Sequence, residues 1–167
     1  MIQSYNTYNN GVKVAKGGVL LITIILLLNM ALAIEGWSFY STPFSLMGAH
    51  PATKKYFSYF IVLQTVILAV LYKRRNVKPF LVFVGLASLM LVSIYDMKNF
   101  SSFHNLFAAL FFLCQPTLFF LEYRKKKDPY ELTKGAILLL LVVLLLSGLL
   151  PIPIFELVSY ALLILFL

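Results

Sequence analysis

Apolar runs of similar length alternate with short polar connectors along most of the chain. Few charged residues interrupt the runs, and lysine, arginine, glycine or proline bounds most of them. A transmembrane helix needs about 20 mainly apolar residues, so the pattern predicts an all-α, polytopic transmembrane helical bundle of about six spans. The predicted spans cover residues 17–34, 56–72, 79–95, 103–121, 135–150 and 154–167.

Two parts of this pattern have a second interpretation. The run 17–34 follows a basic start and contains the small residues Ala31 and Ala33, which also fits a secretory signal peptide. Its apolar stretch is long for such a peptide, so we interpret it as the first span. The last two runs, which two prolines separate, form either two short spans in a hairpin or one re-entrant pair.

Composition indicates a lipid environment. Hydrophobic residues make up 61% of the 167-residue chain, charged residues make up 12%, and the mean hydropathy is +0.90. Soluble domains carry about 25% charged residues, so a water-soluble fold is excluded. The length suits one compact bundle, with a frayed or interfacial polar tail over residues 1–16 and a single transmembrane domain over residues 17–167.

The net charge of +8 has a topological explanation. Lysine and arginine cluster at the ends of the apolar runs rather than in a stripe with aromatic side chains, so no nucleic-acid partner is expected. With six spans, eleven of the 14 basic residues fall on one side of the membrane and three on the other. Because basic loops stay in the cytoplasm, both termini are predicted to be cytoplasmic.

The basic clusters are also candidates for binding anionic lipid headgroups. One cluster follows the second span, and a run of four consecutive cations follows the fourth. Membrane lipids are therefore the expected partners, with other membrane subunits as further candidates. The headgroup candidates are Lys73, Arg74, Arg75, Arg124, Lys125, Lys126 and Lys127.

Candidate chemistry gathers at the predicted non-cytoplasmic face. Asp96 and His104 lie at the two ends of the connector between the third and fourth spans, and Ser45 and His50 precede the second span. A carboxylate beside an imidazole suits acid–base chemistry or, together with His50, a divalent metal. Ser45 is either a nucleophile, if a base lies beside it, or an ordinary turn residue.

A structural role for Asp96 is the competing interpretation. The connector is short, so Asp96 is expected to form a local hydrogen bond or ion pair with His104 or Lys98. Two histidines without a His-x-x-x-His or His-Glu-x-x-His pattern make a poor zinc site. No metal cofactor is therefore expected, and zinc enters only under the alternative in which His50, Asp96 and His104 bind it.

Three further polar side chains within the predicted spans are candidates for a role inside the bundle. Gln64 and Gln115 lie at similar depth in the second and fourth spans and are predicted to share hydrogen bonds inside the bundle, since lipid satisfies no amide. Glu156 comes soon after Pro153. It is either a functional intramembrane carboxylate or a first-turn acid that faces the positive end of its own helix.

The stretch from Ser45 to Pro51, with Asp96 and the pair His104-Asn105, resembles small bacterial membrane proteins of five or six spans and unknown function, which are similar to the DRAM/Sfk-like families. The resemblance implies a helical fold in the bacterial inner membrane. A serine, an acid and histidines around a helical bundle also resemble, more distantly, the ceramidase-like intramembrane hydrolases. That family pattern implies a zinc ion, but no histidine follows His104.

These observations predict a non-enzymatic membrane protein that contacts lipids or serves as an accessory subunit of a larger membrane complex. The alternative is an intramembrane, metal-dependent hydrolase that acts on a lipid, with Asp96, His104 and Ser45 as catalytic candidates. A bound metal or a water-filled polar pocket between the second, third and fourth spans would favour the enzyme.

Overall fold

The computed structural model describes residues 2–38, 40–75 and 78–167, with side chains from residue 14 onward except that of Arg74. These residues form six α-helices and one short 3₁₀ helix, and the described part of the chain contains no β-strand. The predicted all-α fold class is therefore confirmed. The helices are α1 (Ile2–Leu32), η1 (Phe44–Gly48, the 3₁₀ helix), α2 (Lys54–Arg75), α3 (Pro79–Ile94), α4 (Ser101–Lys126), α5 (Pro129–Leu146) and α6 (Ile152–Phe166).

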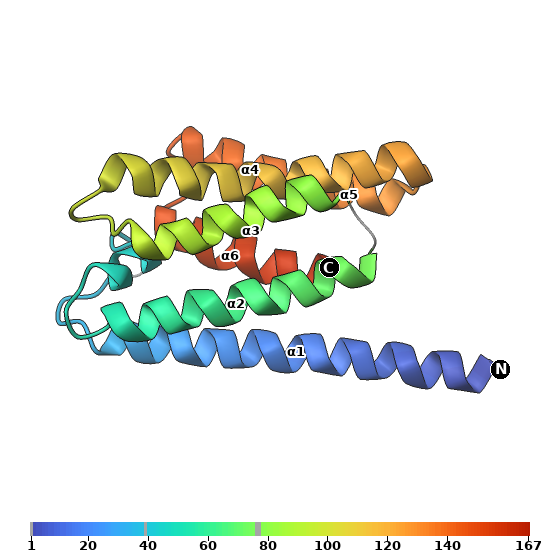
Figure 1. Ribbon diagram of the computed structural model, residues 1–167, viewed down its shortest axis with the longest axis horizontal. Helices are drawn as coiled ribbons and strands as arrows, with labels where there is room; N and C mark the ends of the chain where they lie inside the picture. The colour runs from blue at the N-terminus through green and yellow to red at the C-terminus, as the bar shows by residue number, and fades with distance from the viewer. Residues whose placement is uncertain (1, 39, 76–77) are drawn as a thin grey trace.

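Successive α-helices run in opposite directions (Figure 1). At one end, which we call the basic end, α2 and α4 finish in runs of lysine and arginine and α3 and α5 begin. The opposite end, which we call the connector end, holds η1 and the segments that join α1 to α2, α3 to α4 and α5 to α6. The candidate residues in these connecting segments are thereby brought to the same end of the bundle.

Within the described residues, four helical segments are long and apolar enough to cross a membrane. They are Val14–Leu32, Lys54–Lys73, Ser101–Lys126 and Pro129–Leu146. The other two apolar helices, α3 and α6, have 16 and 15 residues. At 1.5 Å per residue they are roughly 24 and 22 Å long, whereas the hydrocarbon core of a bilayer is about 30 Å thick.

Helix α1 extends beyond the predicted first span. Its backbone is helical from Ile2, so the segment predicted as a frayed or interfacial tail continues the helix. Asn10 and Gly11 form a typical turn pair, yet they lie inside α1. Extension of a helix that has already formed fixes only one residue for each new hydrogen bond, which favours this outcome over a local turn.

Proline and capping residues set the turn between α4 and α5. Lys127 directly follows α4, and its φ of 58° is the left-handed conformation common just after a helix. The Asp128 side chain then accepts a hydrogen bond from the Tyr130 backbone N–H (3.0 Å) and caps α5. Pro129 occupies the first turn, where its missing N–H costs nothing. The two helices therefore reverse direction within a few residues.

Helices α4 and α5 pack closely near this turn. A Cβ atom on Gly135 of α5 would lie 2.9 Å from Cε1 of Phe120 and 3.3 Å from Cβ of Phe119, both on α4. A small residue in α5 thus permits the close approach, as in many membrane helix pairs.

Helix α6 lies between the other helices in Figure 1. Among its 15 residues only Ile152 and Leu165 are exposed. The Phe166 carbonyl accepts a hydrogen bond from Nη1 of Arg75 (2.6 Å), and the Leu165 carbonyl accepts one from Nζ of Lys16 (3.5 Å). Cations stabilise the negative end of a helix. Helix α6 therefore returns to the basic end, antiparallel to α5 (Figure 1).

Gln115 is buried in the bundle and has two hydrogen-bond partners. Its side-chain oxygen accepts from the Tyr72 hydroxyl, and its Nε2 donates to the Phe111 carbonyl (3.0 Å). The prediction that Gln115 lies within the bundle with a partner is therefore confirmed.

Gln64 belongs to a separate group that connects three helices. Its Nε2 donates to Oγ1 of Thr23 on α1 (2.9 Å), and its oxygen accepts from the Tyr160 hydroxyl on α6 (2.7 Å). The predicted hydrogen bond between Gln64 and Gln115 is not found among the described residues. The two glutamines face different neighbouring helices, which their similar depth in the sequence pattern does not reveal.

Candidate functional site

Two adjacent hollows lie toward the connector end. An inner cavity of about 80 Å³ lies among α1, η1, α2, α3, α4 and α6, and its lining is mainly apolar. A groove of about 700 Å³ lies between α4, α5 and α6. Ser45, His104, Ala108, Phe112 and Glu156 line both hollows and therefore separate them. We call Ser45, His104 and Glu156 the polar wall.

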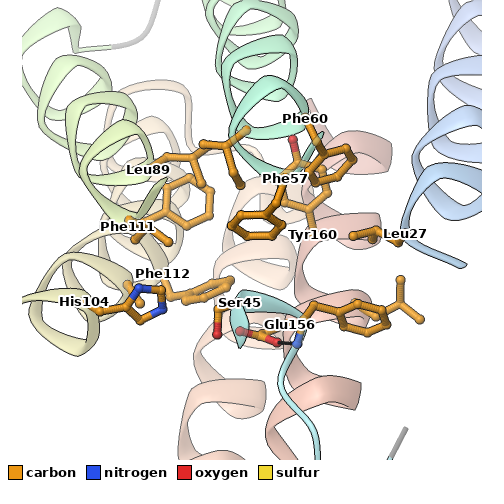
Figure 2. Close-up of a pocket in the computed structure, with 15 residues that line it drawn as sticks. Leu27, Ser45, Phe57, Phe60, Leu89, His104, Phe111, Phe112, Glu156 and Tyr160 are labelled. Carbon is orange, nitrogen blue, oxygen red and sulfur yellow. Dashed lines mark hydrogen bonds between the residues drawn. The ribbon is translucent and has the colours of Figure 1, made fainter. Parts of the chain in front are cut away.

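Figure 2 shows how the polar wall faces the cavity. The Ser45 hydroxyl lies between the His104 ring and the Glu156 carboxylate, along one edge of the cavity. The rings of Phe57 and Phe111 lie on the other side. The polar groups of three different elements, η1, α4 and α6, therefore meet at the border of an otherwise apolar space.

Glu156 attaches η1 to α6. Its Oε2 accepts a hydrogen bond from the Phe44 backbone N–H (2.6 Å), and the Ser45 N–H and hydroxyl also interact with this carboxylate. The first N–H groups of a helix have no partner within the helix, and a carboxylate is favourable there. Glu156 is the fifth residue of α6, and the first turn of α6 holds no acid. The first-turn interpretation is therefore wrong, because Glu156 caps η1 instead.

The Ser45 hydroxyl has Glu156 and a sulfur atom as neighbours. Its oxygen lies 3.8 Å from Sδ of Met97, a weak contact. No hydrogen bond joins Ser45 to His104 among the described residues, although the two line the same cavity. A nucleophilic serine needs an adjacent base, and the group beside this serine is a carboxylate that already accepts backbone hydrogen bonds.

His104 is almost fully buried, with 2% of its surface exposed. Its Nδ1 lies 2.8 Å from the carbonyl oxygen of Tyr95, the residue that ends α3. A carbonyl only accepts hydrogen bonds, so Nδ1 carries the proton, and in the neutral ring Nε2 is an acceptor. The bond ties α4 to α3 and fixes the orientation of the ring at the polar wall.

Asp96 binds groups of the connector end other than His104. Its Oδ1 accepts from the Asn99 backbone N–H (2.8 Å), both oxygens accept from Nδ2 of Asn99 (3.0 Å), and Oδ2 lies 3.3 Å from Nζ of Lys54. The backbone amide of Asn99, followed by its side-chain amide and by Lys54, lowers the pKa of Asp96 from 3.8 to about 2. Asp96 therefore stabilises a turn as an ionised carboxylate.

The predicted bond between Asp96 and His104 is not present among the described residues. Each side chain instead has a nearer partner, since His104 binds the Tyr95 carbonyl and Asp96 binds Asn99 and Lys54. The competing interpretation expected Asp96 to cap or pair locally, and the hydrogen bonds to Asn99 agree with this structural role. It named the wrong cation, because Lys54 comes from the start of α2 and Lys98 from the same connector.

The three candidate metal ligands are not gathered into one site. Nδ1 of His50 accepts from the Ala52 backbone N–H (3.3 Å), and neither His50 nor Asp96 lines the cavity or the groove. Among the described side chains, no group of three or more histidine, cysteine, aspartate or glutamate residues could hold a metal ion.

Some of the headgroup candidates at the basic end form ion pairs within the bundle, and others are exposed. Arg75 forms an ion pair with Glu131 (2.5 Å) in addition to its bond to α6, so its guanidinium is occupied within the bundle. Lys126 pairs with Glu122 (2.5 Å). The side chain of Arg74 lies outside the described residues. The candidates Lys73, Arg124, Lys125 and Lys127 are exposed.

The chain has no match among family models, curated proteins or solved structures. The site is therefore interpreted from its own geometry.

Sequence reasoning selected Ser45 and His104 but assigned Glu156 to its own helix. The sequence holds a signal against the first-turn position of Glu156. Pro151 and Pro153 mark the start of α6, so Glu156 lies too far along the chain to face the first free amides of that helix. The partner in η1 follows only from the tertiary structure.

Proposed function

We propose that this protein is an integral membrane protein that binds a lipid, without transforming it, in the groove between α4, α5 and α6. The observation that carries the proposal is the groove itself, whose apolar sides lead to the polar wall. The apolar sides are formed by Ala109, Leu113, Val142, Leu145, Leu146 and Phe155. Such a gradient matches a molecule with a hydrocarbon chain and a polar head.

The size of the groove fits one small amphiphile. Its volume of about 700 Å³ falls in the range of roughly 300–1,000 Å³ typical of small-molecule sites. It follows α4 from His104 to Leu113, a rise of roughly 14 Å at 1.5 Å per residue. A single hydrocarbon chain can lie along this length with its head at the polar wall.

The proposed topology is six spans with the basic end in the cytoplasm of a bacterial cell. Four helices have the length and composition of spans, and a bilayer thins locally around short apolar helices such as α3 and α6 at modest cost. The opposite directions of successive helices place the basic clusters together, as the positive-inside rule requires. In this orientation the polar wall lies toward the non-cytoplasmic face.

The exposed cations at the basic end support a second lipid contact. Lys73, Arg124 and Lys125 are exposed and would lie at the level of anionic headgroups, where each basic residue contributes about 1 kcal/mol. The outer faces of α1 and α5 are open to lipid or to other membrane subunits, since only 22% and 17% of the residues in their apolar segments are buried.

Photocrosslinking in lipid vesicles tests the groove. The purified protein is reconstituted with a lipid that carries a photoactivatable diazirine in its acyl chain, and the labelled peptides are mapped by mass spectrometry. We expect labels on groove residues of α4 and α5. An Ala109→Trp substitution, which fills the groove, should remove most of this labelling.

The matched control is Ala136→Trp. Ala136 is an exposed alanine of α5 that does not line the groove, so its substitution should leave groove labelling unchanged. Equal labelling of wild type and Ala109→Trp would contradict lipid binding in the groove.

The second candidate is an intramembrane hydrolase that acts on a lipid, metal-dependent as the sequence suggested. It is favoured by one observation, the presence of Ser45 and His104 at the border of a lipid-sized groove. This candidate predicts a stoichiometric metal in the purified protein and release of fatty acid that Ser45→Ala and His104→Gln abolish. Elemental analysis and a fatty-acid release assay distinguish it from the binding protein.

A further inference from the structure

The surroundings of Glu156 differ from those of the three buried acids Asp96, Glu122 and Glu131. Asp96, Glu122 and Glu131 each form an ion pair with a lysine or arginine. Glu156 accepts hydrogen bonds from η1, but no ion pair joins it to a described cation, although it lines both the cavity and the groove. A carboxylate in an apolar site is favoured by a positive partner, and the groove offers space for one.

The polar wall presents acceptors toward this space. The Glu156 carboxylate has lone pairs beyond those used by η1. The Ser45 oxygen also has lone pairs to accept with when its O–H donates to Sδ of Met97 or to Glu156, and Nε2 of His104 is an acceptor in the neutral ring. A primary ammonium group has one positive charge, three N–H donors and no acceptor. It therefore complements all three side chains, whereas a hydroxyl has one donor proton and no charge.

We propose that the polar wall binds the primary ammonium head of a single-chain lipid amine. The inference rests on the proposed function, in which the hydrocarbon chain occupies the groove. The ammonium lies between Glu156, Ser45 and His104, with the charge-assisted bond to Glu156 as the strongest contact. The apolar rings of Phe57 and Phe111 bound the cavity beyond the head and exclude water from this bond.

Other heads of the same chain length fit less well. A fatty acid brings a second negative charge to Glu156, and a fatty alcohol supplies no charge. A trimethylammonium head has the charge but no N–H donors, so it leaves the acceptors of Glu156, Ser45 and His104 without hydrogen bonds. A phosphoethanolamine head has the primary ammonium but also a phosphate, which no cation of the polar wall would neutralise.

The test compares ligands of equal chain length on the purified full-length protein in detergent. Thermal unfolding is measured with dodecylamine, dodecanol, dodecanoic acid and dodecyltrimethylammonium, and a phosphoethanolamine lipid with one chain is added as a fifth ligand. We expect dodecylamine to bind roughly tenfold or more tightly than each of the others, the effect of one charge-assisted hydrogen bond. A phosphoethanolamine lipid that binds as tightly as dodecylamine would overturn the assignment to a simple amine.

Substitutions assign the preference to the polar wall. Glu156→Gln keeps an oxygen that accepts from the Phe44 N–H but removes the charge, so the preference for amine over alcohol should fall to about twofold or less. Ser45→Ala serves as a second variant, with an intermediate loss. The matched control is Glu35→Gln, which removes an exposed acid at the connector end and should keep the full preference.

Each outcome has a defined meaning. Equal binding of amine and alcohol by the wild type, or an unchanged preference in Glu156→Gln, would overturn the ammonium site. Stabilisation by sodium chloride alone, lost in Glu156→Gln and without any preference for amine, would identify an inorganic cation site and also overturn it. If the photoactivatable lipid still labels the groove in those cases, the proposed function stands and only the head assignment fails. Absence of groove labelling would instead reject the proposed function.

Discussion

The two ends of the bundle each hold a carboxylate inside the helical packing, but the partners of the two groups differ. At the basic end, Glu131 lies 2.5 Å from Arg75 and 3.1 Å from Lys134, so its charge is compensated twice. At the connector end, the partners of Glu156 within the described part of the chain are the amides and hydroxyl of η1. A compensated carboxylate fixes helices together, whereas one that lacks a cation remains available to a charged ligand.

The surroundings of the two carboxylates differ in the same way. Around Glu131, Arg75 also binds the end of α6 and lies over the Phe119 ring, 5.1 Å from its centre. Around Glu156 lie a cavity and a groove. Two cations and close packing therefore surround Glu131, whereas space and unused acceptors surround Glu156. Burial alone therefore does not identify a functional carboxylate. Whether a cation pairs with the carboxylate and whether free space lies beside it must be considered together.

The comparison first requires that the two ends face opposite sides of the membrane. In a Cys114→Ala background, a cysteine at Lys125 should react with a membrane-impermeant thiol reagent only from the cytoplasmic side. A cysteine at Asn99 should react only from the other side. Both positions are exposed, so the expected difference is nearly all or none, measured in right-side-out and inverted vesicles. Labelling of both positions from one side would contradict the six-span topology.

The same substitution at the two carboxylates should have different costs. Glu131→Gln leaves Arg75 without its counter-charge, so we expect the free energy of unfolding to fall by about 3 kcal/mol, the lower end of the range for a broken buried ion pair. Glu156→Gln retains an acceptor for η1, and its cost should stay below about 1 kcal/mol. Unfolding by denaturant in detergent measures both. Equal costs would contradict the distinction between the two ends.

The hydrogen bond between Tyr72 and Gln115, which lies between the two ends, should give a smaller change in stability when it is broken. Gln115→Leu leaves the Tyr72 hydroxyl without its partner in the bundle, and we expect a loss of about 1–2 kcal/mol. Adding Tyr72→Phe should cost little more, because the unpaired hydroxyl is then absent as well. A double-mutant cycle on unfolding free energies measures the coupling. Fully additive losses would show that the two side chains do not depend on each other.

The smallest expected effect concerns pH and Asp96. The pKa of Asp96 is about 2 in the folded protein and 3.8 when the carboxyl has no partners, as in the unfolded chain. The folded state therefore favours the ionised form. The resulting stability is present above about pH 4 and is lost as the pH falls from about 4 to about 2. Asp96→Asn should remove this part of the pH dependence and leave any metal content unchanged. A metal that is lost with the substitution would instead favour the hydrolase.

The sequence pattern predicts the helices better than their ends. The prolines and lysines that bound the third apolar run led to a predicted span over residues 79–95, and α3 covers Pro79–Ile94. The prediction for the fourth run, 103–121, stops where charged residues begin, but α4 continues to Lys126. Charged residues mark the edge of the lipid, and a helix extends beyond that edge into water because its backbone bonds remain satisfied there.

Only part of the candidate site could be predicted from the sequence. Helical spacing shows which residues share a face, but it does not show which neighbouring helix that face meets. Ser45 and His104 therefore emerged as candidates, whereas the partner of Glu156 did not. The contact between Lys54 and Asp96 also joins segments 42 residues apart, and no local pattern distinguishes Lys54 from Lys98 as the cation.

The position of α6 has a consequence for how the chain is made. Thr23 on α1 and Tyr160 on α6 meet at the same Gln64 side chain, so the first and last helices complete one polar contact. Tyr160 lies 96 residues after Gln64, and at synthesis rates of about 5–20 residues per second the ribosome needs on the order of ten seconds to make the chain between these two residues. During that interval the Gln64 oxygen lacks its Tyr160 donor inside the membrane. The hydrogen bonds of Gln64 are therefore completed only after α6 has been made.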